Sequence, residues 1–196
     1  GRPLREILAN PLVWTAISGA AIGYAVMSFI MTATPLSMTE MAGHDLDDAK
    51  RVIQLHIVAM YLPSLISGWL TRVVGIPLMM TVGLLAYLAC ILLAASGISF
   101  HHYLWALLLL GVGWNFLFVG GTTLLPQGYQ QSERFRVQGL NDMMVFTAQA
   151  TAALSAGAVL ASVGWASLLL VAVPLLVLHS VLMSVWLLRS RRATTN

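Results

Sequence analysis

The sequence predicts an all-α integral membrane protein with six transmembrane helices, arranged as two inverted three-helix repeats. Of its 196 residues, 59% are hydrophobic and only 9% are charged, and the mean hydropathy is +0.85. A soluble domain carries roughly a quarter of its residues as charges, so this chain lacks the polar side chains that would cover a water-exposed surface. The few charges are clustered between long apolar runs, which excludes a soluble enzyme.

Six apolar stretches are long enough to cross a hydrocarbon layer about 30 Å thick, which takes roughly 20 residues. They lie near residues 11–36, 52–72, 76–96, 102–126, 137–162 and 165–188. Asn10 followed by Pro11 is a typical N-cap and first-turn pair for the first helix. Asp45 and Asp48 are expected to cap the second helix.

The six stretches divide at Gly97 into two pieces of three helices each. We expect a cytoplasmic linker over 1–10, a first repeat over 11–97, a second repeat over 98–188 and a cytoplasmic tail over 189–196. Inverted three-helix repeats are the internal plan of transporter halves. The third and sixth helices are uniformly apolar, so they are expected to face lipid. Because the chain starts at Gly1 and not at methionine, we expect it to be a fragment.

The distribution of basic residues predicts that both termini are cytoplasmic. Lys and Arg accumulate on the cytoplasmic side of a membrane. Eight of the ten fall on one side of the predicted helices: Arg2, Arg5, Arg72, Arg134, Arg136, Arg189, Arg191 and Arg192. Lys50 and Arg51 fall on the other side. This rule accounts for the basic residues, so we expect no nucleic-acid partner.

Polar residues in the first, second, fourth and fifth predicted helices recur at helical spacing, so each of these helices has a polar face. An unpaired amide in hydrocarbon costs several kcal/mol, so we expect the four faces to meet around a central cavity. The candidate lining residues are Tyr24, Met27, Ser28, Met31, Met60, Ser64, Asn115 and Gln149. Asn115 lies close to the middle of the membrane, whereas the hydroxyls of Ser64, Ser67 and Thr71 could equally bond back to their own helix.

Two ionisable residues are candidates for proton coupling. Asp142 is the acidic residue within the predicted spans, and an ionisable group there is a functional candidate by default. It lies near the cytoplasmic end of its helix, so an ion pair with Arg134, Arg136 or Arg72 is the alternative. His56 could relay protons or be a hydrogen-bonded histidine near the outer face. His179, on the apolar sixth helix, is expected to be a packed structural residue.

The sequence gives no support for a metal site, a cofactor or an enzyme. His44, Asp45, Asp47 and Asp48 are of metal-binding types, but they are contiguous and also serve helix capping. The single Cys90 cannot form a disulfide within the chain. No HExxH, GxSxG or phosphate-loop motif occurs.

Four segments resemble one known family. They are MTATPLSM (31–38), QLHIVAMYLPSLISGWL (54–70), GVGWNFLFVGGTTLL (111–125) and ERFRVQGLNDMMVF (133–146). On these segments, the whole chain resembles the C-terminal six-helix half of a bacterial major facilitator superfamily transporter. The resemblance implies residence in the bacterial inner membrane, with the first, second, fourth and fifth helices lining the cavity.

The family's signature loop after the second helix of each half reads roughly G-x-L-x-D-R-x-G. Here Gly68, Leu70 and Gly75 fit this pattern, but Arg72 stands at the Asp position and Val73 at the Arg position. We therefore expect Gly68, Arg72 and Gly75 to form a cytoplasmic gate loop without the usual salt bridge. The two glycines would permit a tight turn and a close helix approach.

Together these features predict half of a secondary active transporter that moves a small organic solute by alternating access. Because the polar face cannot be left to lipid, we expect a partner: the N-terminal half of the same transporter or a second copy. A six-helix scaffold or sensor acting as a homodimer is the alternative, although no loop is long enough to form a soluble domain. An intramembrane enzyme using His56 and Asp142 is disfavoured because these residues are predicted near opposite membrane faces.

Overall fold

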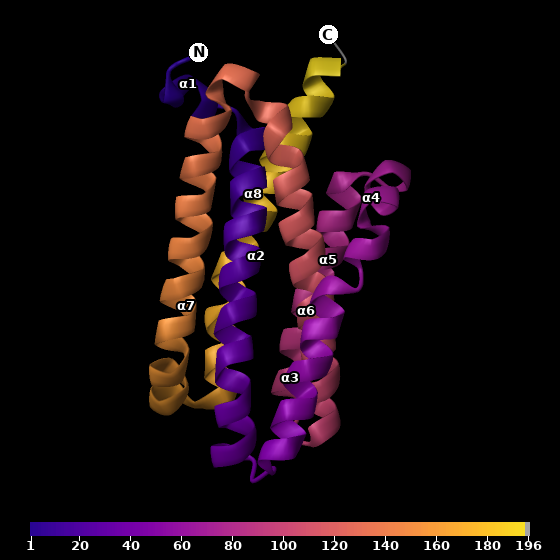
Figure 1. The fold of residues 1–196 in the computed structure, drawn as a ribbon, viewed down its shortest axis with the longest axis vertical. Coiled ribbons are helices and arrows are strands. Elements are labelled where there is room, and N and C mark those ends of the chain that lie inside the picture. Colours follow the sequence, from indigo (N-terminus) through magenta and orange to yellow (C-terminus); the bar gives the residue numbers. More distant parts are fainter. Residues whose placement is uncertain (195–196) are drawn as a thin grey trace.

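The computed structural model describes residues 1–194, and its elements are helices joined by short connections (Figure 1). The long helices are α2 (Pro11–Leu36), α5 (Ile76–Ala95), α6 (Phe100–Leu124), α7 (Arg134–Val171) and α8 (Val173–Thr194). The shorter helices are α1 (Leu4–Leu8), α3 (Leu46–Tyr61) and α4 (Ser64–Val73). A π-helical turn, η1 (Ser37–Met41), follows α2, and two 3-10 turns, η2 (Leu125–Gly128) and η3 (Gln131–Glu133), connect α6 to α7.

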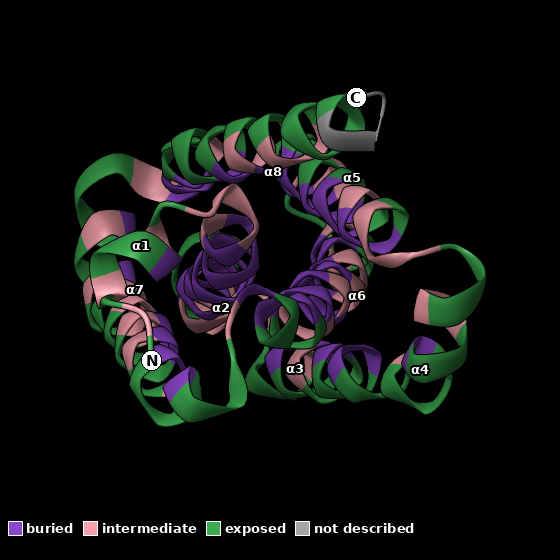
Figure 2. Cartoon of the chain, turned by 90° about the horizontal axis from the view of Figure 1, so that it is seen from above, coloured by how far each residue is buried: buried purple, intermediate pink, exposed green. Residues whose placement is uncertain are grey.

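Helix α2 lies in the interior of the bundle, with α6, α7 and α8 around it (Figure 2). Its start confirms the predicted cap: the Asn10 side chain accepts a 3.0 Å hydrogen bond from the Leu12 N–H, and Pro11 is in the first turn. In its most apolar stretch, 83% of the residues are buried in the protein. A helix surrounded by other helices is apolar on all sides, which is why α2 forms the core.

The second predicted helix, 52–72, is two helices in the structure. It begins earlier, at Leu46, where the Asp45 side chain accepts a 2.7 Å bond from the Asp48 N–H. Asp45 is therefore the cap, as predicted, while Asp48 contributes its backbone N–H. It is then interrupted at Leu62 and Pro63, and α3 and α4 meet at a bend of 40°. Proline has no N–H and its ring collides with the carbonyl one turn earlier, so this bend has a local cause that the predicted single helix did not include.

The chain reverses direction at Gly164, which lies between the predicted stretches 137–162 and 165–188. Its φ of +77° and ψ of 175° are not helical, and a residue with a Cβ is strained there. Figure 1 shows that α7 and α8 run in opposite directions. The observed helical segments extend further than predicted, from Arg134 at one end to Thr194 at the other.

By length and composition, the described residues contain four helices able to cross a membrane, or five if the bent pair α3 and α4 is one span. One of the four is Gln131–Arg192, which has 62 residues. A straight helix of that length would measure about 93 Å, three times the thickness of a hydrocarbon layer of about 30 Å. The turn at Gly164 therefore has to fold it back. The chain is an all-α, multi-pass membrane protein.

Helices α5 and α8 lie at the periphery of the bundle (Figure 2), as expected for the two uniformly apolar helices. Each makes a polar contact with α2. Tyr87 of α5 donates its hydroxyl to the Gly23 carbonyl at 2.5 Å. His179 of α8 is buried, and its Nδ1 lies 2.8 Å from Ser18 Oγ. His179 thus holds two helices together, which agrees with its prediction as a structural residue.

Candidate functional site

The break between α3 and α4 releases backbone carbonyls in the middle of an apolar segment. Pro63 has no N–H to offer to the Ala59 carbonyl. Beyond the break the hydrogen bonds follow a tighter spacing, from Leu65 N–H to Leu62 O at 3.2 Å and from Ile66 N–H to Pro63 O at 3.1 Å. Because an unpaired carbonyl in an apolar environment costs several kcal/mol, a polar side chain is needed at this point.

Asn115 of α6 is that side chain. Its Nδ2 donates a 2.7 Å bond to the Met60 carbonyl and a 2.6 Å bond to Ser64 Oγ, which lie on the two sides of the break. Three predicted cavity residues therefore come together, and we call this contact the Asn115 bridge. The side chain is fully buried, and its Oδ1 has no partner among the described residues. Asn115 thus holds the broken helix and retains one free acceptor.

Gly111, one turn before Asn115, allows α3 to come close enough to form the bridge. A Cβ at this position would lie 2.8 Å from the His56 carbonyl oxygen and 2.9 Å from the Met60 backbone nitrogen. Both are backbone atoms, so any side chain here would push α3 away from α6. The stretch 111–125 is rich in glycine, and at Gly111 the absence of a side chain permits close packing of two helices.

A cluster of aromatic rings lies next to the bridge. Tyr24 of α2 makes edge-on contacts with Trp114 and Phe118 of α6, with ring centroids 5.4 and 5.5 Å apart. Trp114 and Phe118 are stacked at 5.1 Å. Tyr61 of α3 lies 5.6 Å from Trp114, and Phe146 of α7 lies 6.3 Å from Tyr24. We call these five rings the aromatic cluster.

The aromatic cluster combines one buried ring with two open ones. Trp114 is only 4% exposed, whereas Tyr61 and Phe146 are 56% and 57% exposed. The indole Nε1 of Trp114 is buried and has no hydrogen-bond partner in the described part of the chain. Sequence reasoning included only Tyr24 among these rings. The available signal was the depth of Trp114 and its spacing of four residues to Phe118, which places both rings on one face of α6.

The other predicted cavity residues lie around this centre without joining the bridge. Met27 and Ser28 are buried in the core of the bundle, and the hydroxyl of Ser28 has no partner among residues 1–194. Met31 is partly buried against the same core. Gln149 is half-buried on α7, and no described hydrogen bond connects it to Asn115. The structure therefore joins Met60, Ser64 and Asn115 directly and places Tyr24 in the aromatic cluster beside them. Met27 and Met31 pack into the same apolar core as Met60 and Trp114.

The two candidates for proton coupling differ in their surroundings. His56 is fully buried, and its Nδ1 lies 2.7 Å from the Leu107 carbonyl oxygen, while its Nε2 has no partner in the described residues. Asp142 is exposed, and its Oδ1 accepts a 3.2 Å bond from the neighbouring Asn141 amide. Within the described structure it forms no ion pair, so the alternative pairing with Arg134, Arg136 or Arg72 is not present.

The predicted gate loop contains one constrained glycine and one free one. Gly75 has a φ of +84° and starts the tight turn into α5, as predicted. A Cβ at Gly68 would meet no atom within 4 Å, so Gly68 does not mediate a close helix approach in this structure. Arg72 is exposed, and its Nε donates a 3.1 Å bond to the Gly68 carbonyl.

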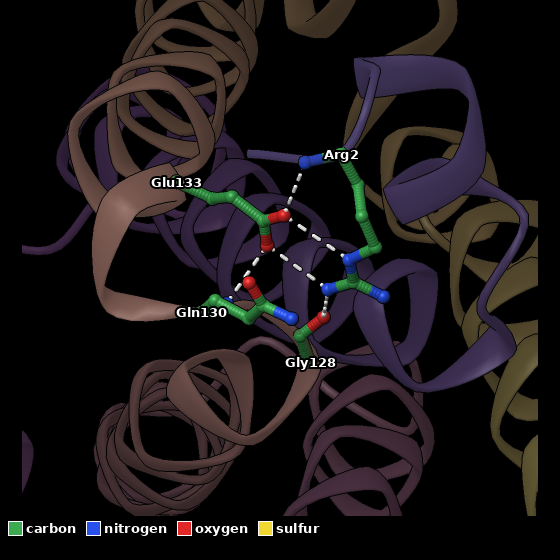
Figure 3. A network of polar contacts seen from close by, with 4 residues as sticks. All are labelled: Arg2, Gly128, Gln130 and Glu133. Atoms are coloured by element: carbon green, nitrogen blue, oxygen red, sulfur yellow. Dashed lines mark hydrogen bonds and ion pairs between the residues drawn. The ribbon is translucent and has the colours of Figure 1, made fainter.

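A charged network joins the N-terminal segment to the loop before α7 (Figure 3). Arg2 forms a two-point contact with Glu133, from Nε to Oε1 at 3.1 Å and from Nη2 to Oε2 at 2.9 Å. The backbone N–H groups of Arg2 and Gln130 donate to the same carboxylate at 2.8 Å each. These donors, the Arg2 guanidinium above all, lower the pKa of Glu133 to about 2, and the carboxylate raises the pKa of Arg2.

The residues that first resembled metal ligands have structural contacts instead. His44 Nε2 lies 2.7 Å from the Ile98 carbonyl oxygen, and its ring packs edge-on against Tyr103. Asp45 caps α3, and Lys50 pairs with Asp47. Across residues 1–194, no three His, Cys, Asp or Glu side chains are grouped in a way that could hold a metal ion.

Comparison with known proteins gives the family. Residues 16–196 match the family model of the Major Facilitator Superfamily. The chain belongs to this superfamily. This confirms the resemblance drawn from the four sequence segments, and it places the chain among membrane transporters and not among enzymes.

Three transporters are similar to this superfamily member. The riboflavin transporter RfnT of Brucella anthropi is 38% identical over 165 residues, which cover 84% of this chain and 41% of that protein. The MFS-type transporters YdeG and YddS of Bacillus subtilis are 37% and 38% identical over 148 and 138 residues. These matches cover 74% and 69% of this chain but 34% and 31% of the two proteins. The chain thus spans less than half the length of each curated relative.

Proposed function

We propose that the chain is the C-terminal half of a twelve-helix secondary transporter, with six spans in two inverted three-helix repeats. The spans would be α2, the bent pair α3 and α4, α5, α6, α7 up to Gly164, and the remaining helical segment through α8. The coverage of 41% of RfnT supports a half-length piece. The N-terminal half of the same polypeptide is the expected partner, and a second copy of this chain is the alternative.

The proposed cargo is a small, flat aromatic solute of low charge, of the riboflavin type. The observation that carries this proposal is the aromatic cluster next to the Asn115 bridge. Flat rings bind aromatic side chains in offset or edge-on contacts, and the buried Trp114 Nε1 and Asn115 Oδ1 provide an unused donor and an unused acceptor. The likeness to a protein named as a riboflavin transporter gives independent support.

Alternating access would use the exposed rings of the aromatic cluster on α3 and α7. Tyr61 and Phe146 are exposed on α3 and α7, and the partner half would cover these rings and close the cavity. Rocking of the two halves would then open the cavity to each membrane side in turn. The bend held by the Asn115 bridge lets α3 and α4 tilt separately, and the turn at Gly75 would form part of the cytoplasmic gate with Gly68 and Arg72.

The proposed orientation has both termini in the cytoplasm of a bacterial inner membrane. Figure 1 places the N-terminal segment, the connection between α6 and α7, and the end of α8 at one end of the molecule. Seven of the basic residues belong to these three segments or to the first turn of α7, and Arg72 lies at the end of α4. The excess of positive charge at this end supports the cytoplasmic assignment.

Proton coupling through His56 or Asp142 is part of the proposal. His56 is buried beside α6, and its Nε2 has no partner among the described residues. Asp142 is exposed on α7. His56→Gln and Asp142→Asn should each be tested for uptake driven by a pH gradient. A residue whose replacement leaves that uptake unchanged takes no part in coupling.

The test of the cargo is riboflavin uptake into vesicles that contain the natural polypeptide carrying these residues. We expect uptake that unlabelled flavin reduces and that sugars and amino acids leave unchanged. Tyr24→Leu should lower uptake, while Trp105→Leu should not, because Trp105 is exposed on α6 outside the aromatic cluster. Absence of riboflavin uptake by a correctly inserted protein, or equal effects of the two substitutions, would overturn the proposed cargo.

The half-transporter proposal has a separate test. An antibody against the terminal sequence RSRRATTN should detect a native membrane product of about twice the 21.1 kDa mass of this chain. A product of the same mass as this chain would contradict it and would favour closure of the cavity by self-association.

A further inference from the structure

An apolar groove lies away from the aromatic cluster, between α2, α7 and α8. Its volume is about 490 Å³, within the range of about 300 to 1,000 Å³ that is typical of small-molecule sites. Helix α2 forms its floor through Ile22 and Phe29, and α7 and α8 form its walls through residues such as Ala152 and Leu178. Figure 2 shows α7 and α8 on two sides of α2, and the groove that these three helices line is partly open.

The polar side chains of the groove are bonded within the protein. Ser18 Oγ bonds to the Thr15 carbonyl and to His179, and Ser155 Oγ donates to the Ala152 carbonyl at 3.1 Å. Trp14 donates its Nε1 to the Leu8 carbonyl at 2.8 Å. Thr151 is the remaining hydroxyl among the lining residues and is exposed. A polar solute would therefore find few partners here, and the groove favours a hydrocarbon chain.

The length and depth of the groove also fit a hydrocarbon chain. Its lining runs along α2 from Trp14 to Phe29, which is about 22 Å at 1.5 Å per residue. This is most of a hydrocarbon layer of about 30 Å. A groove at this depth, in a protein of a membrane transporter family, faces lipid tails and not water.

Positive charge lies at the mouth of the groove. Arg189 follows the lining residue Leu182 by two helical turns on the same face of α8 and is exposed. The bond from Trp14 to Leu8 brings α1 to the same end, with Arg5 and Glu6 both exposed. The net charge of these three residues is positive, which complements the phosphate of an anionic lipid.

We infer that this groove binds one acyl chain of an anionic phospholipid, with its phosphate at Arg189. The occupant is a structural lipid, and none of the five rings of the aromatic cluster lines its groove. This inference stands on the groove and its charges, and it does not depend on the proposed cargo or on which half the chain forms.

The test is native mass spectrometry of the natural polypeptide in detergent, with dioleoyl phosphatidylglycerol or dioleoyl phosphatidylcholine added. We expect one phosphatidylglycerol to be retained in preference to phosphatidylcholine. Ala152→Leu fills the groove and should weaken retention about tenfold. Ala158→Leu is the matched control, because Ala158 is exposed on the same helix outside the groove. Equal retention by the two variants overturns the inference.

The proposed contact between Arg189 and the lipid phosphate is tested by removing the positive charge of the side chain. Arg189→Gln should reduce the retention of phosphatidylglycerol to that of phosphatidylcholine, whereas Arg136→Gln, which removes an exposed charge at the same end, should not. Equal effects of both substitutions overturn the inference.

If Ala152→Leu does not fold, occupancy of the groove can be measured by the quenching of Trp14 fluorescence. Phosphatidylglycerol with brominated chains should quench Trp14 fluorescence, measured as the difference between the wild type and Trp14→Phe, and an unquenched Trp14 overturns the inference.

Discussion

Two of the polar contacts that connect helices inside the apolar body of this protein differ in the backbone that they meet. The Asn115 bridge joins α6 to the broken segment of α3 and α4 and bonds to a main-chain carbonyl at the break. The pair of Ser18 and His179 joins α2 to α8, two helices that are continuous at the contact. The first contact pairs a side chain with a main-chain carbonyl beside an interrupted helix, whereas the second pairs two side chains of helices whose backbones are continuous.

This difference explains why a polar side chain is needed at the position of Asn115, opposite the interrupted helix. Pro63 interrupts the hydrogen-bond ladder of the helix, and Asn115 of the neighbouring α6 donates to the Met60 carbonyl beside this interruption. A bond between intact helices can be lost without exposing a backbone group. We therefore expect substitutions in the Asn115 bridge to lower the stability of the protein more than substitutions in the pair of Ser18 and His179.

The largest effect should come from the glycine that lets α3 approach α6. Gly111→Ala places a methyl group 2.8 Å from the His56 carbonyl oxygen, so α3 must shift and the bridge must open. We expect a loss of about 1–3 kcal/mol in the free energy of unfolding, measured as a lower thermal midpoint in detergent. Gly139→Ala is the control, because a Cβ there meets no atom within 4 Å, and an equal loss in both variants would contradict this account.

Removal of the donor itself should cost nearly as much. Asn115→Leu leaves the Met60 carbonyl and the Ser64 hydroxyl unpaired, which we expect to cost about 1–3 kcal/mol. In a Pro63→Ala background the backbone N–H returns and can continue the helix, so the same substitution should cost less there. The coupling between the two positions is obtained from the thermal midpoints of the two single variants and the double variant. If the two losses of stability simply add, the Asn115 bridge does not compensate for the helix break at Pro63.

Loss of the contact between Ser18 and His179 should lower the stability of the protein by a smaller amount. Ser18→Ala removes one interhelical bond between intact helices, and such bonds in membranes average about 0.6 kcal/mol. The thermal midpoint should fall only slightly, relative to the control Ser162→Ala, whose hydroxyl bonds to its own helix at Val159. A fall in the thermal midpoint as large as that of Asn115→Leu would contradict the expected difference between the two contacts.

The last effect should come from the charged network of Arg2 and Glu133, and it should depend on pH. Glu133 is held ionised by Arg2, with a pKa of about 2 in place of its usual 4.5. Its contribution to stability is therefore complete above about pH 4.5 and is lost as the pH falls toward 2. Glu133→Gln should lower the thermal midpoint at pH 7, and the gap to the wild type should narrow at pH 3. Glu40→Gln, which alters an exposed carboxylate outside the network, should show no such change with pH.

The sequence predicted the features that depend on neighbouring residues. The start of α2 follows from Asn10 and Pro11, and the cap of α3 follows from Asp45, because both are contacts within a few positions of the chain. Gly164 fell in the short gap between two predicted spans for the same reason. The break at Pro63 escaped because its flanking residues are apolar on both sides, as in an uninterrupted span.

The candidate site was less predictable because its contacts cross helices. Helical spacing identified Asn115 as a polar residue facing other helices, but only the packing of α3 against Gly111 shows which atoms it meets. The aromatic cluster draws its rings from four helices, and no spacing within one helix reveals that set. The alternative considered for Asp142, an ion pair with Arg134, Arg136 or Arg72, is not formed in the described structure, because closeness to the same end of the molecule does not determine which side chains meet.

The most direct test of the account is riboflavin binding by the natural polypeptide, followed through quenching of flavin fluorescence. The account predicts saturable binding that Trp114→Leu weakens by about tenfold, since loss of one stacking ring costs about 1–3 kcal/mol. Trp105→Leu, on the exposed side of the same helix, should leave the affinity unchanged. Equal affinities for the wild type and Trp114→Leu would contradict the assignment of the aromatic cluster as the solute-binding face.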